Sequence, residues 1–178
     1  MPTHVAMLRG INVGPHNRVA MPALRDVVAS LGHADVATYI QSGNVVFTAA
    51  DPDAARLERA IAEQLGVDVR VALLSRDELA QVAADNPYAG EPNPKLVHVT
   101  FLPDGADPSL EQVVASANAR AQEKGSADEA ALAGGALFVH TPGGYGTSDL
   151  AKTLVRKVAT GTARNWATVT KLLALLDA

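Results

Sequence analysis

The chain has 178 residues, 48% of them apolar, and a formal net charge of −4. This length can bury one sizeable core or two small ones. The absence of cysteine excludes disulfides, thiolate metal sites and a cysteine nucleophile, and the acidic balance argues against broad, nonspecific binding of nucleic acid. No apolar run approaches the roughly 20 residues that span a bilayer, and the N-terminal residues predict no signal peptide. We therefore expect a cytoplasmic protein.

The first half, residues 1–86, predicts six elements in the order β-α-β-β-α-β, which is the order of the ferredoxin-like split unit. Apolar, β-rich runs predict the strands, and apolar residues at helical spacing predict the helices. A capping box at Ser75–Glu78 predicts a further helix that ends near Ala84, and the turn-rich residues 87–94 predict a connection. The six elements are expected at residues 4–8, 24–31, 36–40, 44–48, 52–65 and 67–74.

The second half, residues 95–178, restarts the pattern of the first. His98–Leu102 is similar to His4–Leu8 at an offset of 94 residues, and Pro108–Ser116 is similar to Pro22–Ser30 at an offset of 86. The difference between the offsets makes the first strand-to-helix connection eight residues longer than its counterpart. The similarity predicts an internal duplication.

Further elements of the second half follow in the matching order. Residues 130–140 predict a hairpin and residues 150–158 predict a helix, after which Thr162–Trp166 leads into a C-terminal helix with an apolar face. The sequence therefore predicts an α+β protein of two ferredoxin-like halves plus a C-terminal helix.

The extra length in the first half is the Arg9–Arg18 loop, which follows the first predicted strand. It holds two glycines that permit positive φ, and two arginines and two asparagines that offer several donors. Backbone N–H groups in such a loop before a helix can cradle an anion. The alternative is a long connection whose polar side chains satisfy its own backbone. The spacings of the Walker and dinucleotide motifs are both absent.

Two other loops carry candidate chemistry. Gln41–Asn44 is a tight hairpin turn, and no turn type requires the glutamine. Gly143–Ser148 precedes a predicted helix with Thr147 or Ser148 as N-cap. This second loop predicts either a phosphate site or an ordinary flexible connection.

The Thr162–Trp166 segment brings a guanidinium, an amide and the only tryptophan to the start of the predicted last helix. Arg164 suits a bidentate contact with a carboxylate or phosphate. Trp166 offers a stacking face but also suits a core position. Residues 150–176 contain five basic residues and no acidic one, which predicts either a cationic patch or a solvated helix face.

Catalytic chemistry is sparse in the sequence. The five histidines show no metal-ligand spacing, and neither a nucleophile elbow nor a carboxylate pair stands out. His16 and Asp149 are the two candidates for a general base. We therefore predict neither a metal nor a cofactor.

Three motifs together closely resemble a bacterial family catalogued as domain of unknown function 1697. They are RGINVG at Arg9–Gly14, YIQSGNVVF at Tyr39–Phe47, and the Arg164–Leu172 segment. The resemblance covers nearly the whole chain and implies two ferredoxin-like halves with no established activity. Carried onto this sequence, the family signature falls on Arg9, Gly10, Asn12, Gly14, Gln41, Ser42, Gly43, Asn44, Ser148, Arg164, Asn165, Trp166, Thr168 and Lys171.

We expect these segments to converge on one cleft between the two halves that binds a small anionic or nucleotide-like ligand. Arg9 and Arg164 are expected to clamp its negative group, and Asn12, Gln41 and Asn44 to read amide-like edges. The predicted ligand-binding residues are Arg9, Gly10, Asn12, Gly14, Arg18, Gln41, Ser42, Asn44, Ser148, Arg164, Asn165, Trp166, Thr168 and Lys171.

Three alternatives stay open, as does the oligomeric state. The first is an enzyme acting on a phosphorylated or nucleoside metabolite, which needs a general base in the cleft. The second is a single-stranded nucleic-acid binder, against which the 4% aromatic content counts. The third is a structural or interaction module, in which Arg9 and Arg164 pair with buried carboxylates such as Asp26 or Asp35.

Overall fold

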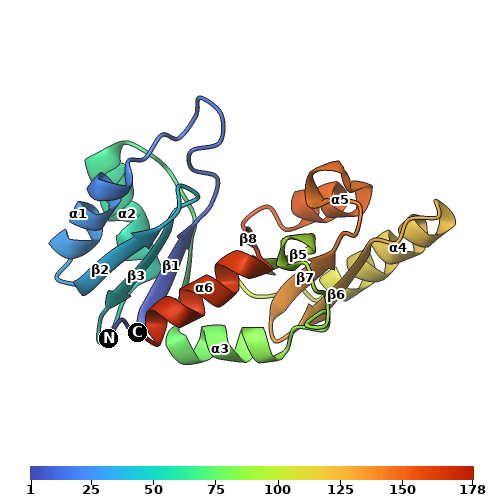
Figure 1. The fold of residues 1–178 in the computed structure, drawn as a ribbon. Helices are drawn as coiled ribbons and strands as arrows, with labels where there is room; N and C mark the ends of the chain where they lie inside the picture. Colours follow the sequence, from blue (N-terminus) through green and yellow to red (C-terminus); the bar gives the residue numbers. More distant parts are fainter. The chain divides into compact units, whose positions relative to one another are not determined.

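The structure, a computed structural model, describes all 178 residues and contains eight strands and six α-helices (Figure 1). The strands are β1 (His4–Leu8), β2 (Ala34–Tyr39), β3 (Asn44–Thr48), β4 (Val71–Ser75), β5 (Val97–Phe101), β6 (Glu129–Ala133), β7 (Ala136–His140) and β8 (Thr162–Asn165). The α-helices are α1 (Met21–Ser30), α2 (Ala54–Leu65), α3 (Arg76–Ala84), α4 (Leu110–Glu123), α5 (Asp149–Lys157) and α6 (Trp166–Leu176). Two short 3₁₀ helices are η1 (Pro94–Leu96) and η2 (Tyr145–Thr147).

The chain divides into two compact units, each built around one sheet. Unit 1 holds residues 1–80 and 171–178, and unit 2 holds residues 81–170. Both sheets are four-stranded and antiparallel, with the orders β2-β3-β1-β4 and β6-β7-β5-β8. Strands at matching places in the sequence occupy matching places in the two sheets. The predicted α+β class with two similar halves is therefore confirmed.

The core of unit 1 lies between its sheet and the helices α1 and α2. Leu57 and Ile61 form one apolar stripe of α2 and are buried against strand residues such as Phe47. Asp53 starts α2 by accepting a hydrogen bond from Arg56 N–H at 2.9 Å, and Gly66 ends it in the left-handed conformation. The polar caps thus fix the length of a helix whose apolar face is held by burial.

The core of unit 2 lies between α4, α5 and the strands β6 and β7. Val114 of α4 and Leu154 of α5 are buried with Leu137 and Val139 of β7. Alanines occupy several of the contacting helix positions, including Ala117, and small side chains let two helices approach closely.

Three predicted boundaries need correction. Residues 162–165 form strand β8 rather than a helix start, because their backbone pairs with β5 from His98 to Phe101. The fourth strand of the first half begins at Val71 instead of residue 67. The connection between β1 and α1 is four residues longer than its counterpart between β5 and α4, rather than eight. The difference shrinks because β5 ends at Phe101 instead of Leu102, α1 begins before Pro22 and α4 begins after Pro108.

Candidate functional site

The Arg9–Arg18 loop is folded on itself. Asn12 N–H donates to the Asn17 carbonyl oxygen at 3.0 Å, and Val13 and His16 form an isolated antiparallel bridge. Both asparagines have positive φ, 53° and 52°, a conformation that asparagine tolerates better than most residues. The loop is therefore a small ordered hairpin with exposed residues at its tip.

Asn12 joins this loop to the Gln41–Asn44 turn. Its Nδ2 donates to the carbonyl oxygens of Val19 at 2.9 Å and Gln41 at 2.8 Å, while its Oδ1 accepts from Val19 N–H at 2.9 Å. The structure thus brings two of the three predicted site segments together within unit 1. Because both amide hydrogens are used inside the protein, Asn12 holds the loop against the turn.

The Gln41–Asn44 turn is built around a buried asparagine. Asn44 is fully buried, and its Nδ2 donates to the Tyr39 carbonyl oxygen at 2.9 Å and to Ser42 Oγ at 3.1 Å. Ile40, just before the turn, has φ of 50° although it is β-branched and 48% exposed, which is a strained backbone conformation. Gln41 is exposed, so the turn presents an amide side chain above a fixed backbone.

The third predicted segment places Arg164 on strand β8. Arg164 is only 8% exposed, and one guanidinium nitrogen donates to the Ala163 carbonyl oxygen at 2.9 Å. Burial lowers the pKa of Arg164 to about 10, so the side chain is still charged at neutral pH. Asn165 caps α6, because its Oδ1 accepts from Thr168 N–H at 2.9 Å and from Thr168 Oγ1 at 3.1 Å. Trp166 is half-buried at the start of that helix.

The prediction that Asp26 or Asp35 is a buried carboxylate paired with Arg9 or Arg164 is wrong for both aspartates. Asp26 and Asp35 are exposed. Asp35 accepts a hydrogen bond from Thr48 Oγ1 at 2.7 Å and lies 3.8 Å from the N-terminal amino group. Lys171, the last predicted site residue, is exposed on α6.

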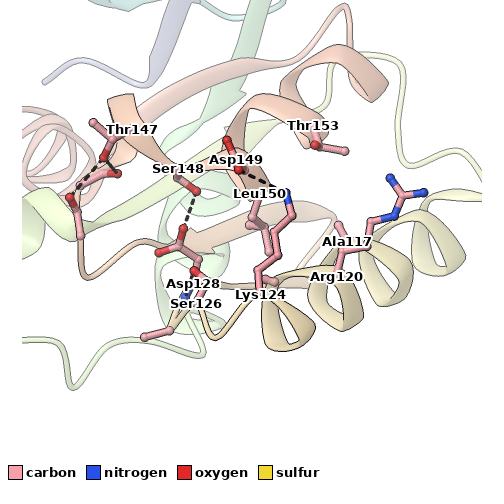
Figure 2. A pocket seen from close by; sticks show the side chains of 14 residues that line it. Ala117, Arg120, Lys124, Ser126, Asp128, Thr147, Ser148, Asp149, Leu150 and Thr153 are labelled. Atoms are coloured by element: carbon pink, nitrogen blue, oxygen red, sulfur yellow. Dashed lines mark hydrogen bonds and ion pairs between the residues drawn. The ribbon is translucent and has the colours of Figure 1, made fainter.

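A pocket of about 620 Å³ lies between α4 and α5 of unit 2 and is closed at one end by the loops that precede β6 and α5 (Figure 2). We call it the α4–α5 pocket. Its lining residues are Ala117, Arg120, Ala121, Lys124, Ser126, Ala127, Asp128, Gly143, Gly144, Thr147, Ser148, Asp149, Leu150 and Thr153. The Gly143–Ser148 loop predicted from the sequence is therefore part of a formed hollow.

Ser148 organises the closed end of the α4–α5 pocket. Its Oγ accepts from Ala151 N–H at 3.0 Å, which makes Ser148, one of the two predicted candidates, the N-cap of α5. The same Oγ donates to Asp128 Oδ2 at 2.7 Å (Figure 2). Ser148 is 4% exposed. The hydroxyl therefore links the helix start to the loop before β6 and fixes Asp128 at the edge of the hollow.

Two basic side chains reach the pocket from α4, in different ways. Lys124 Nζ lies 3.3 Å from Asp149 Oδ2, an exposed ion pair of small energetic weight. The side chain of Arg120 makes no hydrogen bond or ion pair, and Figure 2 shows its guanidinium directed away from Asp128 and Asp149. Neither residue is predicted as a site residue from the sequence, although their spacing of four places them on one helix face.

An aromatic stack holds the glycine-rich loop from behind. The ring of Tyr145 in η2 lies on the ring of His98 in β5, with centroids 3.8 Å apart and planes 17° apart. Burial lowers the pKa of His98 to about 4, and its buried Nδ1 has no hydrogen-bond partner. His98 is therefore neutral at physiological pH and acts as a flat packing surface for the loop.

A histidine–carboxylate pair that the sequence did not reveal lies elsewhere in unit 2. Nε2 of His140 and Oε2 of Glu91 are 2.7 Å apart, and Asn93 N–H donates to Glu91 Oε1 at 2.9 Å. The ring of Tyr88 stacks on His140 with centroids 5.3 Å apart, and burial raises the pKa of Tyr88 to about 12. The pair fastens the connection before β5 to the end of β7.

We expect the stability lost in Glu91→Gln to depend on pH. The pKa of Glu91 is lowered below its ordinary value, mainly by the hydrogen bond from Asn93 N–H and to a smaller extent by the contact with His140. A carboxylate with a lowered folded-state pKa stabilises the fold above its unfolded pKa, and this contribution disappears as the pH falls through the folded value. Denaturant unfolding from pH 7 to pH 3 should show the variant less stable above about pH 4.5, with the difference shrinking below it. A constant difference would contradict this assignment.

No group of three or more histidine, aspartate or glutamate side chains gathers in the structure in a way that could hold a metal ion. None of the helices is both long and apolar enough to cross a bilayer.

Comparisons with known proteins agree with the fold and the sequence motifs. The sequence profile of a family described as "Protein of unknown function (DUF1697)" matches residues 1–138. The chain belongs to this family. The chain is also similar to the solved structure of the conserved bacterial protein SP0830 from Streptococcus pneumoniae. The two sequences are 25% identical, and the structures superpose with a TM-score of 0.75 over 98% of each chain. A comparison with curated proteins finds no similar one. The family resemblance of the sequence is therefore confirmed.

Proposed function

We propose that the protein binds a small anionic metabolite in the α4–α5 pocket. The observation that carries the proposal is the gathering of donors around one hollow of about 620 Å³, a size typical of small-molecule sites. Arg120 brings positive charge from α4, and the N-terminus of α5 adds the partial positive charge of a helix start. Hydroxyl groups of Thr147 and Thr153 complete the polar lining.

The two carboxylates of the pocket narrow the class of ligand. Lys124 neutralises Asp149, and Asp128 accepts a hydrogen bond from Ser148. Carboxylate oxygens that keep lone pairs available accept hydrogen bonds from hydroxyl or amino groups. The pocket therefore suits a ligand that combines an anionic group with hydroxyl or amino groups, and it disfavours a purely anionic polymer.

The polar segments that the family signature marks stay candidates for ligand contact. In unit 1 they are the Arg9–Arg18 loop and the Gln41–Asn44 turn, which are hydrogen bonded to each other. The prediction that they and the Arg164–Lys171 segment bind one nucleotide-like ligand stays a prediction, as does the cytoplasmic location.

We also propose that the chain arose by duplication of a ferredoxin-like unit. The support is the matching strand order of the two sheets and the helix that directly follows the fourth strand of each, α3 after β4 and α6 after β8. A fold of this kind hosts many unrelated functions. The duplication therefore accounts for the fold alone, and the proposed function rests on the pocket.

The proposal is tested by filling the pocket. Thr153 is half-buried on α5 and lines the hollow, so the larger side chain of Thr153→Phe should occupy it. In a thermal-shift screen against phosphorylated and carboxylated metabolites, a ligand at 100 times its Kd should stabilise the wild type by about 2.7 kcal/mol. Thr153→Phe should remove that shift.

Val155→Phe is the matched control, because Val155 is on the same helix, is 37% exposed and does not line the pocket. It should keep the ligand-induced shift. A metabolite that stabilises the wild type and Thr153→Phe equally binds elsewhere and would overturn the proposal. Circular dichroism and the thermal midpoint of both variants without ligand show whether each is still folded.

A further inference from the structure

The α4–α5 pocket continues into a second hollow of about 260 Å³ along the same two helices. The two hollows share Ala117, Arg120 and Thr153. The residues added by the second hollow are Gln112, Val113, Ser116 and Lys157. Together the hollows form one groove, which we call the α4–α5 groove.

The charges differ between the ends of this groove. The first hollow contains both carboxylates, Asp128 and Asp149. The second hollow contains Arg120 and Lys157 and no carboxylate. Neither of these two cations makes a hydrogen bond or ion pair within the protein, so the groove has one mixed end and one purely cationic end.

The position of each of these two basic residues is partly explained by stabilisation of its own helix. Arg120 lies in the last turn of α4 and Lys157 in the last turn of α5, where positive side chains interact favourably with the helix dipole. The dipole does not explain why both cations line one hollow together with the hydroxyl groups of Ser116 and Thr153. This one hollow is therefore lined by two positive charges and two hydroxyl groups.

From this arrangement we infer that the groove takes a phosphate monoester whose body carries hydroxyl groups. The inference rests on the proposed function and specifies its ligand. The phosphate dianion matches the paired charges of Arg120 and Lys157, and arginine forms bidentate contacts with phosphate oxygens. The hydroxyl-bearing body extends past Thr153 toward Asp128 and Asp149, whose oxygens accept its hydrogen bonds.

The cationic end is tested with inorganic phosphate and ribose 5-phosphate, titrated at constant ionic strength and followed by NMR chemical shifts of the protein. Arg120→Gln and Lys157→Gln should each weaken the binding of both probes by about tenfold, because each removes a charge-assisted hydrogen bond. Arg156→Gln is the matched control, since Arg156 carries the same charge on the same helix turn but lines a different hollow. It should change the Kd by less than about twofold.

The carboxylate end is tested with Asp149→Asn. This variant should weaken ribose 5-phosphate but leave inorganic phosphate unchanged or slightly tighter, because the phosphate alone does not reach Asp149. Equal weakening of phosphate by Arg120→Gln, Lys157→Gln and Arg156→Gln would show a diffuse charge effect and overturn the inference.

The outcomes separate this inference from the proposed function. A metabolite whose binding is lost in Thr153→Phe but not in Arg120→Gln or Lys157→Gln would keep the pocket and reject the phosphate end. Absence of binding by phosphate, ribose 5-phosphate and every metabolite of the screen would reject both.

Discussion

Gly43→Ala should lower the free energy of unfolding by about 2 to 5 kcal/mol. Gly43 has φ of 84°, and a Cβ atom there would lie 2.5 Å from Ile11 Cδ1 and 3.0 Å from Leu8 Cβ. Overpacking of this kind costs about 1 to 3 kcal/mol, and the left-handed backbone adds about 1 to 2 kcal/mol for a residue with a side chain. Urea unfolding of the wild type and the variant measures the difference.

Gly10→Ala is the matched control for this prediction. Gly10 also has positive φ, 63°, but nothing lies within 4 Å of the position of its Cβ. The control should therefore show only the backbone cost of about 1 to 2 kcal/mol. Equal losses in the two variants would mean that Ile11 moves aside freely and that the loop is not packed against the turn.

Phe47→Ala should destabilise the protein by about 3 to 5 kcal/mol, the usual cost of removing a buried aromatic ring. Phe47 is fully buried in the core of unit 1, on the central strand β3, and its ring stacks on His33 with centroids 4.8 Å apart. The midpoint of urea unfolding measures the loss. Val13→Ala, at a residue that is 68% exposed, should change stability by no more than about 0.5 kcal/mol. A loss below about 1 kcal/mol for Phe47→Ala would contradict the assigned core.

The sequence predicts most strands of the protein but not β8, for a physical reason. Strands such as β1 and β7 are continuous apolar runs that are buried on both faces. In contrast, Thr162–Asn165 is short and contains an arginine and an alanine, so its local preference does not favour a strand. This segment forms strand β8 because it pairs with the free edge of β5. That edge exists only in the folded sheet, so the local sequence does not predict the pairing.

The candidate pocket could be predicted only in part. The Gly143–Ser148 loop was recognisable because glycines and a capping hydroxyl precede a helical pattern. Arg120 and Lys124 were not recognisable, because they lie 23 and 19 residues before Gly143 on a helix with ordinary surface composition. Their side chains share a hollow with Ser148 only because α4 packs on α5. Such a site follows from packing rather than from a local motif.

The hydrogen-bonded base of the Arg9–Arg18 loop separates its tip from the rest of unit 1. Gly14, Pro15 and His16 are exposed and lie inside the turn closed by the Asn12–Asn17 hydrogen bond. Extra residues at such a tip add little closure entropy, and the Asn12 contacts with Val19 and Gln41 stay in place. The tip is therefore a natural attachment point for a fluorescent reporter, which leaves every residue of the α4–α5 groove unaltered.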